Sequence, residues 1–398
     1  MKKLLTLLLC LVLALGIAAC GSTEETTETG TDDGLFTEES DRSETLSSSD
    51  KTTDKTTNRK TDTSSNVTSE QKDLTVPPDG LTFDTEAEHK FFATDIKMTC
   101  LVIFDLNQYI GDLNALTDTR SFSWIWDPES DPKCHIMPGA GIDSAKLRYS
   151  PYFERDVVIA CSSNGWAGVI DYEARSLLWE YNIGDGPHSI EMLPNGDVVV
   201  AGSGNGSTTG KIAYVPLGAG FRAPVFSIAA PSAHGVMWDP QNEVLWGLEM
   251  SRIVPYRVVN PGTKDAKLEP VEEDIVSLKG DSGGHVLSPV LGQPGKYWVT
   301  AGKVWLFDAN EKTLSNTMPN YTAYNQRNVK GMVSFPDGTF VQTVGGVGKK
   351  TMYDWSTPVL RIGLIRDYGD KGTLPLIKQI QFTNREFYKV FPVTKEYQ

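Results

Sequence analysis

The chain has 398 residues, and its 51 Asp and Glu against 37 Lys and Arg give a formal net charge of −14. An acidic balance of this size argues against nucleic-acid binding and against a basic face that lies on a membrane. No long stretch shows helical periodicity. Short runs rich in Val, Ile, Tyr and Trp alternate instead with Gly, Pro, Asn and Asp. This pattern predicts an all-β fold.

The N-terminus has the features of an export signal. Lys2-Lys3 precedes an apolar run, 4–17, that is too short to span a membrane comfortably. The run ends in Ile17-Ala18-Ala19-Cys20-Gly21, which resembles the lipobox of bacterial lipoproteins. The resemblance implies that 1–19 is a signal peptide and that Cys20 is lipidated; an ordinary secretory signal is the alternative. We therefore expect an extracytoplasmic lipoprotein, anchored through Cys20 to the membrane at the bacterial cell surface.

Residues 20–78 form the second segment. Thr, Ser, Asp, Glu and Lys dominate it, and Phe36 is its one aromatic residue. Such a composition cannot bury enough apolar surface to offset the entropy lost on ordering, so we expect a disordered linker. Its r.m.s. reach of roughly 40 Å suits a tether. The folded domain is then 79–398, which we expect to be monomeric.

Apolar runs between turn residues predict the strands of this domain. A front group holds the strands 91–96, 100–105 and 122–126 and lacks an inner strand. The second strands of the later groups are 156–162, 197–202, 243–248, 296–301 and 339–344. Their third strands are 166–172, 211–215, 252–258, 303–308 and 359–366, and their outer strands are 177–183, 224–229, 275–278 and 376–382.

Inner strands recur at a period of roughly 45 to 50 residues, which is the mark of a β-propeller. The proline of the following turn sets their register, because His188 and His234 each lie six residues before such a proline. A longer turn follows His285, which we place by its downstream strand. In this register the inner-strand position is held by Ala145, His188, His234, His285, Lys330 and Glu386.

The C-terminal segment 386–392 also has an inner-strand pattern. We expect it to complete the first blade, because pairing the two chain ends removes open sheet edges. This closure gives six blades, or seven if 107–143 contains another.

Equivalent inner-strand positions of a propeller form a ring at one mouth of its central channel. Three of the five histidines of the chain, His188, His234 and His285, fall at this position, together with Lys330 and Glu386. The three imidazoles are candidate ligands of a divalent metal, with Glu386 as a fourth ligand. Alternatively, one histidine acts as a general base beside Lys330, the electrostatic partner of an acidic sugar. In a purely structural reading, each histidine bonds the backbone of the neighbouring blade.

Two short motifs carry a family resemblance. Pro187-His188-Ser189 and Ala233-His234-Gly235-Val236-Met237-Trp238-Asp239 resemble those of an uncharacterised family of exported bacterial propeller domains, over most of 81–398. More distantly, the histidines resemble those of propeller polysaccharide lyases that act on uronic acids. The full lyase ligand set is not matched, so the catalytic residues of those enzymes do not carry over.

Further residues bear on the site. Gly280-Asp281-Ser282-Gly283-Gly284 is identical to the segment around the nucleophile of trypsin-like proteases, but the required Ala-Ala-His-Cys context is missing, which argues against proteolysis. Trp166, in a loop, is the aromatic residue best placed to stack on a sugar ring, and His135 is expected to overhang the same mouth. The three cysteines of the domain do not suggest a disulfide framework; we expect buried thiols at Cys100, Cys134 and Cys161, with one bridge as the alternative.

Two functional hypotheses follow from these patterns. In the first, a surface lipoprotein binds a glycan or another small polar ligand at the histidine mouth, with or without hydrolytic or lyase activity. In the second, the propeller is a non-enzymatic scaffold for protein partners, and its rim carries the function.

Overall fold

The computed structural model describes residues 88–109, 111–118, 121–206, 208–315, 327–348, 351–365 and 376–398. The chain divides into the units Met1–Ser69 and Glu70–Gln398, and every described residue belongs to the second unit. The expected signal peptide, Cys20 and the linker therefore lie outside the described residues. Within the described ranges, no helix combines the length and the apolar character needed to cross a membrane.

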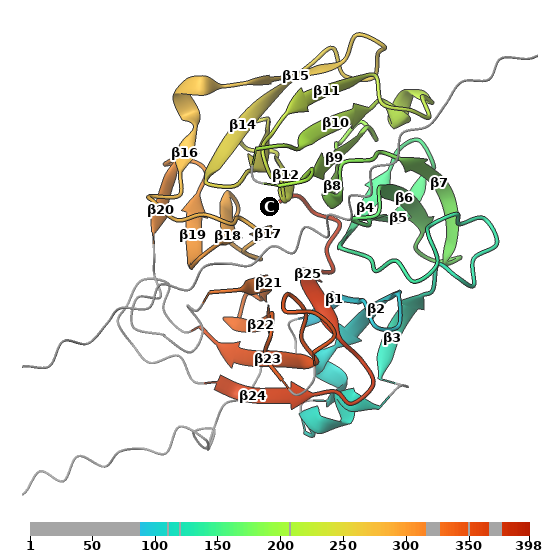
Figure 1. Ribbon diagram of the computed structural model, residues 1–398, viewed down its shortest axis with the longest axis vertical. Helices are drawn as coiled ribbons and strands as arrows, with labels where there is room; N and C mark the ends of the chain where they lie inside the picture. The colour runs from blue at the N-terminus through green and yellow to red at the C-terminus, as the bar shows by residue number, and fades with distance from the viewer. Residues whose placement is uncertain are drawn as a thin grey trace, which may run out of the picture. The chain divides into compact units, whose positions relative to one another are not determined.

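The strands form six antiparallel sheets, which we number as blades 1 to 6 (Figure 1). From the inner strand outwards, blade 1 consists of β25 (Phe387–Pro392), β1 (Lys90–Asp95), β2 (Cys100–Asp105) and β3 (Phe122–Trp126). Blade 2 consists of β4 (Ser144–Ser150), β5 (Arg155–Cys161), β6 (Trp166–Asp171) and β7 (Ser176–Asn182). Blade 3 consists of β8 (Pro187–Met192), β9 (Val198–Gly202), β10 (Lys211–Val215) and β11 (Phe226–Ala229).

The second half of the chain repeats this order. Blade 4 consists of β12 (Gly235–Asp239), β13 (Val244–Leu248), β14 (Arg252–Val259) and β15 (Lys267–Pro270), and β16 (Val276–Ser277) also pairs with β14. Blade 5 consists of β17 (Val286–Pro289), β18 (Lys296–Thr300), β19 (Val304–Asp308) and β20 (Thr313–Ser315). Blade 6 consists of β21 (Val329–Ser334), β22 (Thr339–Val344), β23 (Val359–Leu364) and β24 (Leu376–Gln381).

The inner strands β25, β4, β8, β12, β17 and β21 surround a common centre, and each contacts the next around the ring (Figure 1). The expected all-β, six-bladed propeller closed by the C-terminal strand is therefore confirmed. Instead of a seventh blade, the described part of 107–143 holds β3 and the short 3-10 helices η1 (Leu106–Tyr109) and η2 (Leu113–Thr117). Two further 3-10 helices are η3 (Leu217–Ala219) and η4 (Glu272–Asp274).

The hairpin between β8 and β9 shows why these sequences fold as blades. Leu193 donates its backbone N–H to Asp197, and Gly196 donates to Leu193, so the turn is closed by two hydrogen bonds. Gly196 has φ +87°, a left-handed conformation that glycine adopts without strain. The equivalent Gly338 of blade 6 also has φ +87°. The strands that follow are rich in β-branched residues, which favour extended backbone.

Buried apolar residues gather mainly where two neighbouring blades face each other. Between blades 1 and 2, Trp124 and Trp126 pack with Val158, Ala160 and Ile170. Between blades 3 and 4, Ile212 and Tyr214 pack with Leu245 and Tyr256. Each fully buried Val, Leu or Ile among them contributes about 1.5–3 kcal/mol.

Two outer strands differ from the sequence expectation. In blade 4 the main fourth strand is β15, whereas the predicted strand at 275–278 corresponds to the short β16. In blade 5 the three-residue strand β20 was not predicted. Both strands lie at blade edges and carry few buried residues, so their apolar pattern is weak.

The last residues of the chain cross the end of the channel where the inner strands finish. Tyr397 donates its hydroxyl to the carbonyl of Met192, the last residue of β8, at 2.6 Å. Tyr297 donates to the carbonyl of Gln398 at 2.7 Å. Above this tail, Arg148 lies 4.8 Å from the Tyr397 ring centre and forms a buried ion pair with Glu191 at 2.7 Å. The tail is thus fixed to several blades at this end of the channel.

Candidate functional site at the channel mouth

Irregular pairing at the start of each inner strand positions the candidate site. In blade 3, Pro187 pairs with Gly202 and Ser189 with Ala201, so His188 is an extra residue in its strand. Lys330 is the corresponding extra residue in blade 6. In blade 1, Tyr388 and Lys389 lie opposite the single residue Thr94. A bulge of this kind redirects a side chain out of the regular alternation of the sheet.

The other three blades repeat this arrangement. The backbone N–H of His234 bonds Leu248, which also pairs with the next residue, Gly235. Likewise, the backbone N–H of His285 bonds Thr300, which also pairs with the residue after His285. The backbone N–H of Asp143 bonds Cys161, which also pairs with the residue after Asp143. The ring in the structure is therefore Asp143, His188, His234, His285, Lys330 and the pair Tyr388 and Lys389.

The structure corrects two positions of the predicted ring. Ala145 lies two residues beyond the ring position, which Asp143 occupies, because the hairpin of blade 2 is longer than that of blade 3. Glu386 precedes β25 and is not the ring residue of blade 1. Glu386 was assigned to the ring because Pro392 follows it by six residues, the spacing seen at His188 and His234. In the structure, Pro392 is the last residue of β25 and pairs with Phe91. The described residues after β25, 393–398, contain no further strand, so this proline does not mark a hairpin turn.

The three histidines of the ring do come together. The rings of His188 and His234 are stacked, with centroids 4.4 Å apart, and His285 meets His234 edge-on at 5.2 Å. His234 donates from Nδ1 to the carbonyl of Ser232 at 2.8 Å, which leaves its Nε2 as an acceptor. All three side chains are partly exposed. They form a continuous imidazole ladder across three adjacent blades.

Two buried lysines accompany this ladder. Lys330 is 5% exposed, and its ammonium lies 2.7 Å from Nε2 of His285. Lys389 is fully buried, donates to the backbone carbonyl of His188 at 3.0 Å, and lies over the Tyr388 ring at 5.0 Å. Asp143 supplies the carboxylate of the ring, 3.5 Å from Nδ1 of His188. The ring thus carries two ammonium groups against one carboxylate, an excess of one positive charge.

Burial sets the titration behaviour of these groups. It lowers the pKa of Lys330 to about 8, and the nearby charge of Lys389 acts in the same direction. Burial also lowers the pKa of Lys389 to about 8, against the opposing field of Asp143. Burial and the neighbouring His188 hold the pKa of His234 well below its usual range. Burial, reinforced by Lys330, does the same to the pKa of His285. Both imidazoles are therefore neutral at pH 7, while a lysine with a pKa of about 8 remains about 90% protonated.

Two imidazole nitrogens of the ring have no hydrogen-bond partner within the described part of the protein. They are Nδ1 of His188, whose 3.5 Å separation from Asp143 exceeds a hydrogen bond, and Nδ1 of His285. When Lys330 donates to Nε2 of His285, the proton of that imidazole sits on Nδ1 and is available as a donor. Buried polar atoms without a protein partner are uncommon and point to a ligand or an ordered water.

An aromatic platform extends the ladder to the surface. The rings of Tyr353 and Trp355 are stacked 4.6 Å apart and are 44% and 37% exposed. Trp355 meets Tyr388 edge-on at 4.9 Å, and Tyr388 lies 6.2 Å from His188. Glu386 holds this loop, since it accepts hydrogen bonds from the Met352 N–H at 2.5 Å and from the Ser356 hydroxyl. The role of Glu386 in the structure is therefore to anchor the platform.

The metal hypothesis receives no support from this geometry. Among the residues that the structure describes, no group of three or more His, Cys, Asp or Glu side chains could hold a metal ion. His188 and His234 stack face to face instead of directing nitrogens to one point, and Nε2 of His285 is occupied by Lys330. The expected ligand set of His188, His234, His285 and Glu386 does not form.

Trp166 and His135 lie away from the imidazole ladder. Trp166 is 5% exposed and stacks on Trp126 at 6.0 Å, so its face is not open to a sugar at the channel mouth. His135 contacts Glu180 on β7, the outer strand of blade 2, at 2.5 Å. Both residues line a separate pocket of about 480 Å³.

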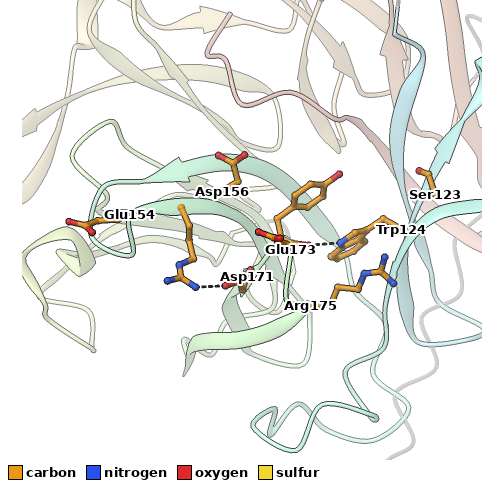
Figure 2. Close-up of a pocket in the computed structure, with 9 residues that line it drawn as sticks. Ser123, Trp124, Glu154, Asp156, Asp171, Glu173 and Arg175 are labelled. Carbon is orange, nitrogen blue, oxygen red and sulfur yellow. Dashed lines mark hydrogen bonds and ion pairs between the residues drawn. The ribbon is translucent and has the colours of Figure 1, made fainter.

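Another pocket, of about 710 Å³, lies between blades 1 and 2 (Figure 2). Arg155 pairs there with Asp171 at 2.6 Å, and Trp124 donates to the carbonyl of Tyr172 at 2.7 Å. Carboxylates and guanidinium groups both line it, with Glu154, Asp156, Glu173 and Arg175 as further lining residues. These side chains neutralise one another in part, unlike the ring with its excess of positive charge.

The three cysteines of the domain are free, with Cys100 and Cys161 buried and Cys134 half-buried. Burial raises the pKa of Cys100 to about 12 and that of Cys134 to about 11. The expectation of unbridged thiols is confirmed, and as neutral thiols they are weak nucleophiles.

Fold and site together define a six-bladed β-propeller with a cationic, histidine-lined channel mouth. The model of a family of unknown function, DUF6528, matches residues 110–345, more than half of the chain, and the chain belongs to this family. This agrees with the predicted resemblance to an uncharacterised propeller family. Comparison with curated proteins gives no match.

Three solved structures illustrate the structural similarity. A protein of unknown function from Bacteroides caccae has 12% identity and a TM-score of 0.46 over 77% of this chain and 99% of its own. The mitotic checkpoint complex provides a chain with 9% identity and a TM-score of 0.44, over 79% of this chain and 87% of that one. The Cps50 (Swd1) β-propeller domain of Myceliophteria thermophila has 10% identity and a TM-score of 0.39, over 60% and 71%.

Proposed function

We propose that the propeller binds an acidic carbohydrate at the channel mouth and does so as a lipoprotein on the bacterial cell surface. The observation that carries the proposal is the pair of buried ammonium groups, Lys330 and Lys389, beneath partly exposed histidines. A buried cation is unfavourable unless it is paired, and the ring offers one carboxylate for two ammonium groups. An anionic ligand group would supply the missing negative charge.

The neighbouring groups favour a sugar as the bearer of this charge. Nδ1 of His285 and Nε2 of His234 offer a donor and an acceptor that suit sugar hydroxyls. Beside them, the exposed faces of Tyr353 and Trp355 suit the apolar face of a pyranose ring. A carboxylate between polar donors and an aromatic platform is the chemistry of a uronic acid within an oligosaccharide.

The surface location is supported by the sequence alone. Cys20 and the segment before it resemble a lipobox, and the polar segment 20–78 has the composition of a tether. An extracytoplasmic location would bring the mouth into contact with polysaccharides of the environment or of the cell envelope.

Isothermal titration of the purified protein with trigalacturonate, at pH 7 and low salt, tests the proposal. We expect binding that weakens at least tenfold in Lys330→Met and in Lys389→Met, and that also weakens in Trp355→Ala. Lys395→Met removes an exposed lysine that pairs with Asp156 at 3.0 Å, and it serves as the matched control with unchanged binding. Binding is expected to survive EDTA.

Titration with polyanions of sulfate and phosphate, but without sugar rings, shows whether the carbohydrate matters. Equal affinity for these ions and for trigalacturonate would show that the site recognises negative charge and that the sugar rings contribute nothing to binding. No binding of any acidic oligosaccharide, or binding that ignores both lysine variants, would refute the proposal and leave the rim scaffold as the remaining hypothesis.

A further inference from the structure

The pocket around His135 is separate from the channel mouth and is built on different chemistry. It lies over the outer strands β6 and β7 of blade 2 and the connection that enters this blade. His135, Asn164, Trp166, Glu180, Tyr181 and Asn182 line it, with Ile136 and Met137. Its volume, about 480 Å³, falls in the range of small-molecule sites.

Glu180 holds the pocket together. Its carboxylate accepts from the backbone N–H of His135 at 3.0 Å, from Nδ1 of His135 at 2.5 Å, and from Nε1 of Trp166 at 2.8 Å. Although burial opposes the charge, these donors lower the pKa of Glu180 overall, so it is ionised at pH 7. Because three protein donors already occupy it, this carboxylate has little capacity left for a cationic ligand, and its charge repels an anionic one.

The two asparagines are oriented by their own turns. Oδ1 of Asn182 accepts from the N–H of Gly184 at 3.1 Å, and Oδ1 of Asn164 accepts from the N–H of Trp166 at 3.4 Å. Both are local turns in which the side-chain oxygen bonds the backbone two residues on. With its oxygen directed to the backbone, each amide keeps its NH₂ group for other partners.

Nε2 of His135 adds a further polar group. Since Nδ1 of His135 faces Glu180, Nε2 points away from the carboxylate, and the side chain is 80% exposed. Apolar surface completes the pocket: Tyr181 is 37% exposed and Met137 is 62% exposed. Trp166 and Trp126 stack behind the polar groups as a rigid support.

We infer that this pocket is a second carbohydrate site, which takes an uncharged sugar residue. The amide NH₂ groups of Asn164 and Asn182 and Nε2 of His135 bind its hydroxyl groups, and the ring of Tyr181 contacts its apolar face. The site differs from the channel mouth in charge, since its lining residues include no lysine and Glu180 repels carboxylates. It therefore does not depend on the proposed function of the mouth.

Titration of the purified full chain with three uncharged tetrasaccharides, built from glucose, xylose or N-acetylglucosamine, tests the inference. We expect at least one to bind. Tyr181→Ala should weaken this binding at least tenfold, whereas Tyr181→Phe, which keeps the ring, should retain it. Asn182→Asp keeps the oxygen that Gly184 needs but removes the NH₂ donors, and it should also weaken binding at least tenfold.

Two control variants establish that the sugar binds in this pocket. Tyr149→Ala removes another exposed tyrosine of blade 2, on β4, and should leave binding unchanged. Lys389→Met should also leave it unchanged, because the channel mouth is not involved. Thermal melts of each variant establish that it is folded. The inference is overturned if none of the three sugars binds, if Tyr181→Ala and Asn182→Asp bind like the parent, or if binding is lost in Lys389→Met.

Discussion

Replacing Lys389 by methionine should stabilise the propeller while it weakens anion binding. The side chain is fully buried, and its pKa falls from an ordinary 10.5 to about 8 because of that burial. Each tenfold change in an equilibrium constant corresponds to about 1.4 kcal/mol, so the charged form is disfavoured in the folded state by about 3 kcal/mol. Methionine fills a similar volume without a charge. It leaves the carbonyl of His188 without its donor, which costs about 1 kcal/mol.

The net expectation for Lys389→Met is a gain of about 2 kcal/mol in the free energy of unfolding at pH 7. Urea denaturation followed by tryptophan fluorescence measures this quantity. Lys395→Met, in the same C-terminal region but at an exposed ion pair, should change stability by less than about 1 kcal/mol.

The pH dependence of the stability difference between the parent and Lys389→Met provides an independent test. Because the pKa of Lys389 is lower in the folded than in the unfolded state, the folded state binds fewer protons between pH 8 and 10.5. The parent therefore gains stability from this lysine as pH rises through that window, and its difference from the methionine variant should shrink. A variant that is less stable than the parent by more than about 1 kcal/mol, with unchanged ligand binding, would show that Lys389 is a structural brace between β25 and β8.

Further predictions concern closure, the pH range of binding and the platform. A chain that stops after Arg385 lacks β25 and the buried Phe387, Val390 and Phe391, so it should lose at least about 5 kcal/mol of stability or fail to fold; an unchanged melting temperature would contradict the closure. Binding of trigalacturonate should weaken as pH rises through about 8, because Lys330 and Lys389 lose their protons there, and a flat titration profile between pH 7 and 9.5 would exclude their charges as the cause. Glu386→Ala removes the oxygen that accepts from the Met352 N–H and the Ser356 hydroxyl, and it should lower affinity for trigalacturonate but not for monomeric galacturonate, as measured by titration with both; equal losses for the two ligands would place Glu386 at the anion itself.

Most of the fold could be predicted from the sequence repeat, because each blade uses the same kinds of turn and strand residues. The hairpin at Gly196, and the β-branched strand after it, occur in several blades with similar spacing, so strand order and six-fold repetition could be predicted. Edge strands such as β20 bury few residues and leave little apolar pattern to detect.

The candidate site could be predicted only in part. Its residues were located by counting six residues back from the proline of the following turn, and this spacing depends on the length of the hairpin. His188 and His234 obey the rule that a turn proline follows six residues later, whereas His285 is placed by its downstream strand. Asp143 does not obey it, since its hairpin is longer, and aligning the second strands at Cys161 and Ala201 would have found it. Lys389 was missed because the described residues after β25 form no further strand. No hairpin turn with a proline therefore marks the position of Lys389. A signal was nevertheless present, because Tyr388-Lys389-Val390 matches Val329-Lys330-Gly331 in the position of its lysine.

Stacking partners, by contrast, are set by tertiary contacts that the sequence pattern does not contain. Trp166 begins a strand after a glycine turn and was expected to be exposed, but Trp126 of the preceding blade covers it. Trp355 has no comparable strand context, and its exposure follows from the loop that Glu386 anchors.

Closure of the ring by the C-terminal strand has a consequence for the order of folding. β1 leaves the ribosome early, whereas its partner β25 is synthesised only after the strands of blades 2 to 6. Arg385 and Asp95, which form an ion pair at 2.8 Å across this junction, are 290 residues apart in the chain. Closing a loop of this length costs roughly 5 kcal/mol of chain entropy. Until β25 is synthesised, blade 1 has an unpaired inner edge that can join a strand from another molecule. A chain that is truncated or stalled before β25 is therefore expected to aggregate more readily than the closed propeller.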